Sequence, residues 1–140
     1  MRLSGRSPAP EAAPLYADLF GEDGTGLLHS DMQDWQLHNV APWTLSHAGH
    51  DVGVGGFRIG FGDTGLELMF HFLPEVWGQG LASEFVQAAL DHARTTLRED
   101  TFFAKVAREN SASMRVLEKA GFCETGVDTG KILMRLTLPA

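Results

Sequence analysis

The sequence has almost no cysteine and no long hydrophobic run, and both absences exclude classes of protein. Its single cysteine, Cys123, excludes an internal disulfide. No window approaches about 18 consecutive apolar residues, so we expect no membrane-spanning helix and no membrane partner. Residues 1–13 lack the apolar run of a secretory signal peptide, which favours a cytoplasmic protein. The length of 140 residues predicts a single domain, residues 1–140.

Positive charge is scarce as well. The chain carries 11 basic and 18 acidic residues, a net charge of −7. Because the basic residues are scattered rather than clustered, we expect no nucleic-acid partner. An acidic surface favours the approach of a cationic substrate, although many soluble proteins without such a substrate are equally acidic.

No group of side chains has the spacing of metal ligands. The nearest pair of histidines, His47 and His50, spans a predicted turn. The sequence therefore predicts no metal site. The tryptophans are expected to serve packing, and they are Trp35, Trp43 and Trp77.

The first 42 residues give the weakest structural signals. Residues 2–4 could form a short first strand, and the apolar spacing over residues 10–20 predicts a helix. The glycines of residues 21–26 indicate a break in the chain. Residues 31–38 are expected to form only one or two helical turns.

Strand signals follow. Residues 43–47 and 51–61 flank a predicted turn at residues 48–50, and a second turn is expected at residues 62–65. Residues 66–73 alternate well, with Leu66, Leu68, Phe70 and Phe72 on one face.

The second half of the chain alternates between helix and strand. Apolar spacing predicts a long helix over residues 80–97, then a strand over 101–107 and a helix over 111–120. Residues 122–129 and 131–138 resemble a closing hairpin. This order predicts an α/β protein with a mixed sheet and helices on both of its faces.

Specific residues mark the ends of the last helix. Asn110 can cap its start. Gly121 suits the left-handed position after its end, where Phe122 can pack back on Leu117 in a Schellman motif. Cys123 follows directly and is expected to be in the core.

The connection between the predicted strand and the long helix is the most informative segment. Residues 74–84 read Pro-Glu-Val-Trp-Gly-Gln-Gly-Leu-Ala-Ser-Glu. Gly78 and Gly80 let the backbone turn tightly, so that its N–H groups and those of the first helical turn can bind a phosphate. The loop itself contains no Lys or Arg, which is consistent with binding by the main chain. A simple tight connection would explain the same two glycines.

This segment resembles the pyrophosphate loop of the GNAT superfamily of N-acetyltransferases, Arg/Gln-x-x-Gly-x-Gly/Ala. Trp77, Gly80 and Ala82 occupy its three fixed places, with Trp77 replacing Arg or Gln. A second stretch, residues 109–122, is similar to the Asn-x-x-Ser…Glu-Lys-x-Gly-Phe signature of one branch, the one that resembles ribosomal-protein N-terminal acetyltransferases. Two motifs in the right order are more specific than either alone.

The resemblance implies a GNAT-like fold with a central mixed sheet of six to seven strands, and acetyl-CoA as co-substrate. It implies an enzyme that moves the acetyl group to a primary amine by direct attack in a ternary complex. The diphosphate would contact the loop residues Trp77, Gly78, Gln79, Gly80, Leu81, Ala82 and Ser83, mainly through their amides. The pantetheine arm would meet the main chain of Phe70, His71 and Phe72, and the side chain of Asn110, unless that residue is only a helix cap.

The resemblance also suggests catalytic residues, each with a simpler alternative. Glu67 on the fourth strand could take the proton of the amine, and His71 lies about 13 Å farther along the same face. Ser113 could protonate the departing thiolate. The alternatives are a solvated carboxylate, a structural histidine and an exposed serine. Many family members carry a tyrosine a few residues farther on, where this chain has Val116 and Leu117.

The acceptor and the assembly stay open. Residues 21–42 look short for the region that commonly shapes the acceptor pocket in this family, so residues 1–40 match it poorly. A small amine and a protein N-terminus both fit, and residues 131–138 could pair across a homodimer. A catalytically inactive CoA-binding module, acting in regulation or assembly, is the alternative function.

Overall fold

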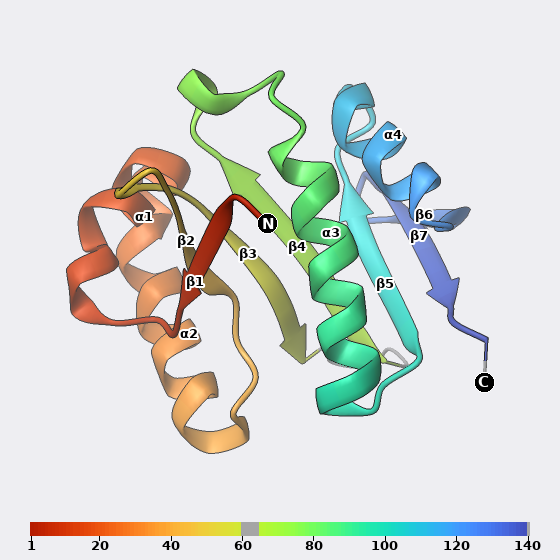
Figure 1. Cartoon of the computed structure of the whole chain (residues 1–140). Coiled ribbons are helices and arrows are strands. Elements are labelled where there is room, and N and C mark those ends of the chain that lie inside the picture. Colours follow the sequence, from red (N-terminus) through yellow and green to blue (C-terminus); the bar gives the residue numbers. More distant parts are fainter. Residues whose placement is uncertain (60–64, 140) are drawn as a thin grey trace. The chain divides into compact units, whose positions relative to one another are not determined.

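The computed structural model describes residues 1–59 and 65–139. Its strands form a seven-stranded mixed sheet in the order β1-β2-β3-β4-β5-β7-β6 (Figure 1). Two compact units make up the chain: a first unit of Met1–Arg58 and Met69–Leu81, and a second unit of Ile59–Leu68 and Ala82–Ala140. None of the helices in the described ranges is long and apolar enough to cross a bilayer.

The first unit contains three antiparallel strands, β1 (Leu3–Arg6), β2 (Trp43–His47) and β3 (His50–Ile59). Ala48 and Gly49 join β2 to β3 with positive φ angles of 53° and 83°, as a tight hairpin turn requires. The three predicted strands are confirmed. Residues 60–61 of the predicted third strand and residues 62–64 of the next turn lie outside the described residues.

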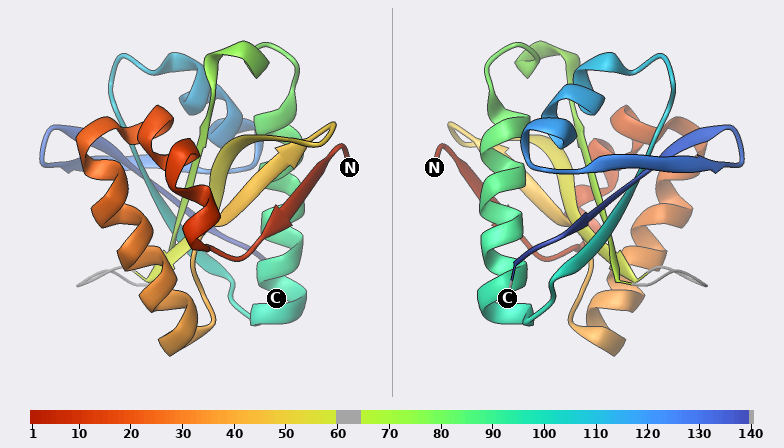
Figure 2. Two further views of the ribbon diagram at one scale, coloured as in Figure 1. Left: turned by 90° about the vertical axis from the view of Figure 1, so that its left-hand side faces the viewer. Right: turned by 90° about the vertical axis from the view of Figure 1, so that its right-hand side faces the viewer.

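Helices α1 (Ala13–Phe20) and α2 (Gly24–His38) lie side by side in the first unit (Figures 1 and 2). A turn of 3-10 helix at Pro10–Ala12 leads into α1, which confirms the first predicted helix. The two helices pack on β3 and β4 through a shared core. The core side chains are Ala12, Leu15, Tyr16, Leu28, Val54 and Met69.

The prediction for residues 21–38 is only partly right. The chain does break after α1, where Gly21 has a φ of 61° and Gly21–Asp23 form one 3-10 turn. The break is shorter than predicted and the helix is longer, because α2 begins at Gly24 and runs for 15 residues. Gly24 is helical, with φ −60° and ψ −44°, and a Cβ there would lie 2.6 Å from the Tyr16 carbonyl oxygen. The glycine that looked like a breaker therefore lets α2 start against the backbone of α1. The region therefore holds a full second helix, and its proposed shortening relative to the family stays a prediction.

The second unit contains α3, β5, α4 and a final hairpin. Helix α3 (Leu81–His92) continues as a π-helical turn over Ala93–Leu97, so the predicted helix is confirmed and its last turn is wider than expected. Strand β5 (Thr101–Val106) buries the neighbouring side chains of Phe102 and Phe103. Neighbouring side chains of a strand point to opposite faces of the sheet, so β5 is buried on both faces. This agrees with the predicted sheet that has helices on both of its faces.

Helix α4 (Ser111–Lys119) ends as the sequence predicts. The amide of Gly121 donates to the Glu118 carbonyl at 3.0 Å and the amide of Phe122 donates to the Leu117 carbonyl at 3.0 Å, which is a Schellman motif. The hairpin of β6 (Cys123–Asp128) and β7 (Lys131–Thr137) follows, as Figure 2 shows. The placement of Cys123 in the core is wrong: β6 is an edge strand, and this thiol is exposed.

Candidate functional site

Strand β4 (Leu66–Phe72) leads into the glycine loop (Figure 1). Pro74 cannot donate to a strand ladder, and Pro74–Val76 form one turn of 3-10 helix. The amide of Leu73 donates to the Val52 carbonyl at 2.8 Å, and the amide of Trp77 donates to the Pro74 carbonyl at 3.1 Å. The start of the loop is therefore held on β3 and on its own first turn.

Two exposed glycines shape the loop before α3. Gly78 and Gly80 have φ angles of 79° and 77°, a conformation that residues with a Cβ rarely adopt. Around Gly78 a Cβ would meet nothing within 4 Å. The loop then enters α3 at Leu81, where the amides of the first turn form the positive end of the helix dipole. Exposed backbone beside such a helix end can hold an anion.

Trp77 occupies the place of the family's Arg or Gln, and the packing role predicted for it is wrong. Its side chain is 67% exposed. The indole Nε1–H donates to the Phe72 carbonyl at 2.8 Å. Trp77 therefore fixes the loop to the end of β4. The Phe72 carbonyl accepts this hydrogen bond with one of its two lone pairs.

The side chain of Arg2 contacts the loop, and the sequence did not suggest this contact. Its Nη2 donates to the Gln79 carbonyl at 2.7 Å. The same nitrogen is the nearest atom, at 3.7 Å, to a Cβ placed on Gly80. Arg2 and Gln79 are 77 residues apart, and no local pattern could have indicated the contact.

The candidate bases both lie on β4. Glu67 is half-buried and pairs with Phe103 in the parallel ladder between β4 and β5. His71 is exposed, and its ring meets that of Phe20 edge to face, with the centroids 5.0 Å apart. Phe70, between them, is half-buried. The catalytic roles of Glu67 and His71 stay predictions.

The start of α4 is capped as expected. Asn110 Oδ1 accepts a hydrogen bond from the Ser113 amide at 3.1 Å, which confirms the cap. Ser113 is half-buried in the first turn, and its proposed role as an acid stays a prediction. Leu117, near the place of the family's tyrosine, is 1% exposed.

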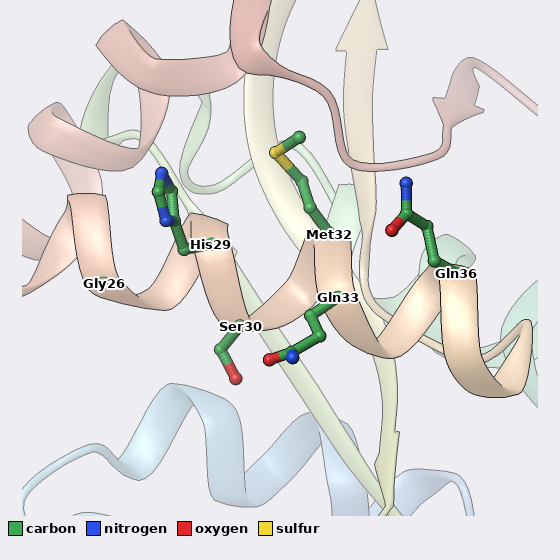
Figure 3. A pocket seen from close by; sticks show the side chains of 6 residues that line it. All are labelled: Gly26, His29, Ser30, Met32, Gln33 and Gln36. Carbon is green, nitrogen blue, oxygen red and sulfur yellow. The ribbon is translucent and has the colours of Figure 1, made fainter.

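A cavity of about 550 Å³ lies along α2 (Figure 3). Ser30 and Gln33 point to one side of the helix, and His29, Met32 and Gln36 point to the other. Imidazole, hydroxyl and amide groups can bind a polar ligand by hydrogen bonds. Gly26 completes the lining.

A buried polar cluster, which the sequence did not reveal, joins α1, α2 and β3. Asp31 is 1% exposed and accepts from Tyr16 Oη at 2.6 Å, from Arg58 Nε at 3.0 Å and from Arg58 Nη2 at 3.1 Å. Burial, and then the hydrogen bond to Asp31, raise the pKa of Tyr16 above its usual range. We call Tyr16, Asp31 and Arg58 the Asp31 cluster. Because Tyr16 and Asp31 are buried, we assign the cluster a structural role.

Comparison with known proteins agrees with this architecture. Residues 15–123 match the model of the acetyltransferase (GNAT) domain family. The uncharacterized N-acetyltransferase p20 of Bacillus licheniformis is 32% identical over 77 residues, which are 54% of this chain and 43% of that protein. The chain therefore matches less than half the length of this relative.

Solved structures share the fold. An acetyltransferase from Agrobacterium tumefaciens str. C58 aligns with a TM-score of 0.83 and 22% identity, over 96% of this chain and 90% of that one. The yncA protein of Salmonella typhimurium, solved with its cofactor acetyl-CoA, aligns with a TM-score of 0.76 and 19% identity, over 100% of this chain and 96% of that one. Because the family model matches most of the length of the chain, the chain belongs to the GNAT family of acetyltransferases.

Proposed function

We propose that this protein is an acetyl-CoA-dependent N-acetyltransferase whose glycine loop binds the cofactor diphosphate. The observation that carries the proposal is the pair of exposed, left-handed glycines, Gly78 and Gly80, directly before the first turn of α3. Amides from Gly78 to Ser83 would donate to the diphosphate oxygens. The acetyl-CoA of the yncA protein and the family match support the same ligand.

The reaction would proceed in a ternary complex. Glu67 or His71 removes a proton from the ammonium group, directly or through water, because only the neutral amine has a lone pair. The nitrogen then forms a bond to the thioester carbon, and the carbon–sulfur bond breaks. As the amide forms, the nitrogen loses its second proton, and the Ser113 hydroxyl relays a proton to the CoA thiolate, which leaves as the thiol. Main-chain groups of Phe70 to Phe72 would position the pantetheine arm, with Asn110 as a further partner.

We place the acceptor amine along α2, at the cavity that His29, Ser30 and Gln33 help to line. These polar groups suit an acceptor that offers hydrogen bonds near its amine, such as a protein N-terminus or a small polar amine. A protein N-terminus would agree with the resemblance to ribosomal-protein acetyltransferases. A cytoplasmic location and a homodimer through residues 131–138 stay proposals from the sequence.

The loop assignment is tested by calorimetry with acetyl-CoA. Gly80→Asp adds bulk and negative charge to the loop, at a φ of 77° that residues with a Cβ rarely adopt, so we expect at least tenfold weaker binding. Gly130→Asp is the matched control, because Gly130 is also exposed, has a φ of 83° and lies in the β6–β7 turn. If Gly80→Asp binds as tightly as the wild type, the loop does not hold the diphosphate.

One feature favours the second candidate function, an inactive CoA-binding module. Leu117 is buried near the place where many relatives carry the tyrosine that acts as an acid. An assay of thiol release from acetyl-CoA, run over a panel of amines and N-terminal peptides, separates the two functions. Turnover with any acceptor excludes the inactive module, and tight binding without turnover over the panel supports it.

A further inference from the structure

We propose that Arg2 is a positioning residue for the diphosphate loop: it holds the Gln79–Gly80 peptide in the orientation that directs the Gly80 amide toward the cofactor. The inference rests on the proposed function of the loop. It adds the start of the chain, far from both sequence motifs, to the machinery that binds acetyl-CoA.

Arg2 starts from an anchored position. It precedes β1, whose four residues all pair with β2, with Leu3 opposite His47. Leu3 is 5% exposed, so the backbone next to Arg2 is fixed in the first unit. From there the guanidinium reaches the Gln79 carbonyl, and 2.7 Å is a short distance for an N–H···O hydrogen bond, as is typical of a charged donor.

The peptide geometry links this contact to ligand binding. The described chain has no cis peptide bonds, and in a trans peptide the C=O and the following N–H point in opposite directions. A donor that holds the Gln79 carbonyl on one side therefore fixes the Gly80 N–H toward the other side. Gly80 supplies the N–H of this peptide and Gly78 lies one residue before it, and glycine backbone rotates freely. The Arg2 contact thus restrains the part of the loop that most needs restraint.

Arg2→Met tests the idea, because it keeps much of the aliphatic stem and removes every donor. The contact is exposed, and a net loss of one such hydrogen bond predicts about three- to tenfold weaker binding of acetyl-CoA by calorimetry. Arg6→Met is the matched control: Arg6 is the last residue of β1, the strand that follows Arg2, and it pairs with Asp51 at 2.8 Å. It should bind acetyl-CoA as the wild type does.

A second ligand separates positioning from general damage. S-acetylpantetheine lacks the diphosphate, and its affinity, measured by NMR titration, should be the same for Arg2→Met and the wild type. Equal loss for both ligands, or no loss for acetyl-CoA, overturns the role of Arg2. If Gly80→Asp also binds acetyl-CoA normally, the loop assignment itself has failed. If only Gly80→Asp loses affinity, the loop stands and the Arg2 inference falls.

Discussion

Replacing Asp31 by Asn should destabilise the protein strongly. The carboxylate is 1% exposed and accepts three hydrogen bonds, two of them from the Arg58 guanidinium. Asn keeps the shape but loses the charge and one acceptor oxygen. Breaking a buried ion pair by removing one partner costs about 3–5 kcal/mol. Because the Arg58 side chain is 24% exposed and can be partly hydrated, we expect about 3 kcal/mol.

That loss is large against the roughly 5–15 kcal/mol that stabilises a domain. Urea unfolding followed by circular dichroism measures it, and at a slope of about 1–3 kcal/mol/M the midpoint should fall by about 1–3 M. Asp51→Asn is the matched control, since Asp51 forms a partly exposed pair with Arg6 and should cost less than about 1 kcal/mol. A loss below 1 kcal/mol for Asp31→Asn would refute the assigned role of the Asp31 cluster.

Three further predictions concern single side chains. Because the pKa of Tyr16 is raised, its contribution to stability is complete below about pH 10 and is lost as the pH rises above that value. In Tyr16→Phe the urea midpoint should therefore fall less steeply above pH 10. An unchanged pH dependence would contradict this. Thr44 is 1% exposed and its hydroxyl has no partner within the described part of the chain, so Thr44→Val should raise stability by about 1 kcal/mol in urea unfolding; a decrease would argue against it. Asn110→Ala should lower the stability by about 1 kcal/mol, because α4 loses its N-cap. Asn110→Asp should keep the stability but lose affinity for acetyl-CoA. Normal affinity in Asn110→Asp would mean that Asn110 serves only as a cap.

The elements with local signals could be predicted from the sequence. Asn110 and Gly121 delimit α4, and alternation locates β4, because capping and strand periodicity depend on near neighbours. The glycine loop and the GNAT fold followed from short motifs. These predictions hold wherever the described residues test them.

Contacts between distant segments could not be predicted. Gly24 looked like a helix breaker, although its role is to let α2 approach the backbone of α1. Nothing in the sequence indicated that Asp31 is buried, because its partners Tyr16 and Arg58 lie on other elements. Arg2 belongs to the loop only because β1 brings it to Gln79. In each case the partner lies on another segment of the chain, so the spacing of near neighbours does not reveal the contact.

Amide chemical shifts test the central claim most directly. In a ¹⁵N-labelled sample titrated with acetyl-CoA, the amides of Gly78 and Gly80 should move most, because they would gain charged acceptors. S-acetylpantetheine, which has no diphosphate, should leave both signals in place. If acetyl-CoA binds while these two glycine signals do not move, the diphosphate lies elsewhere and the account is contradicted.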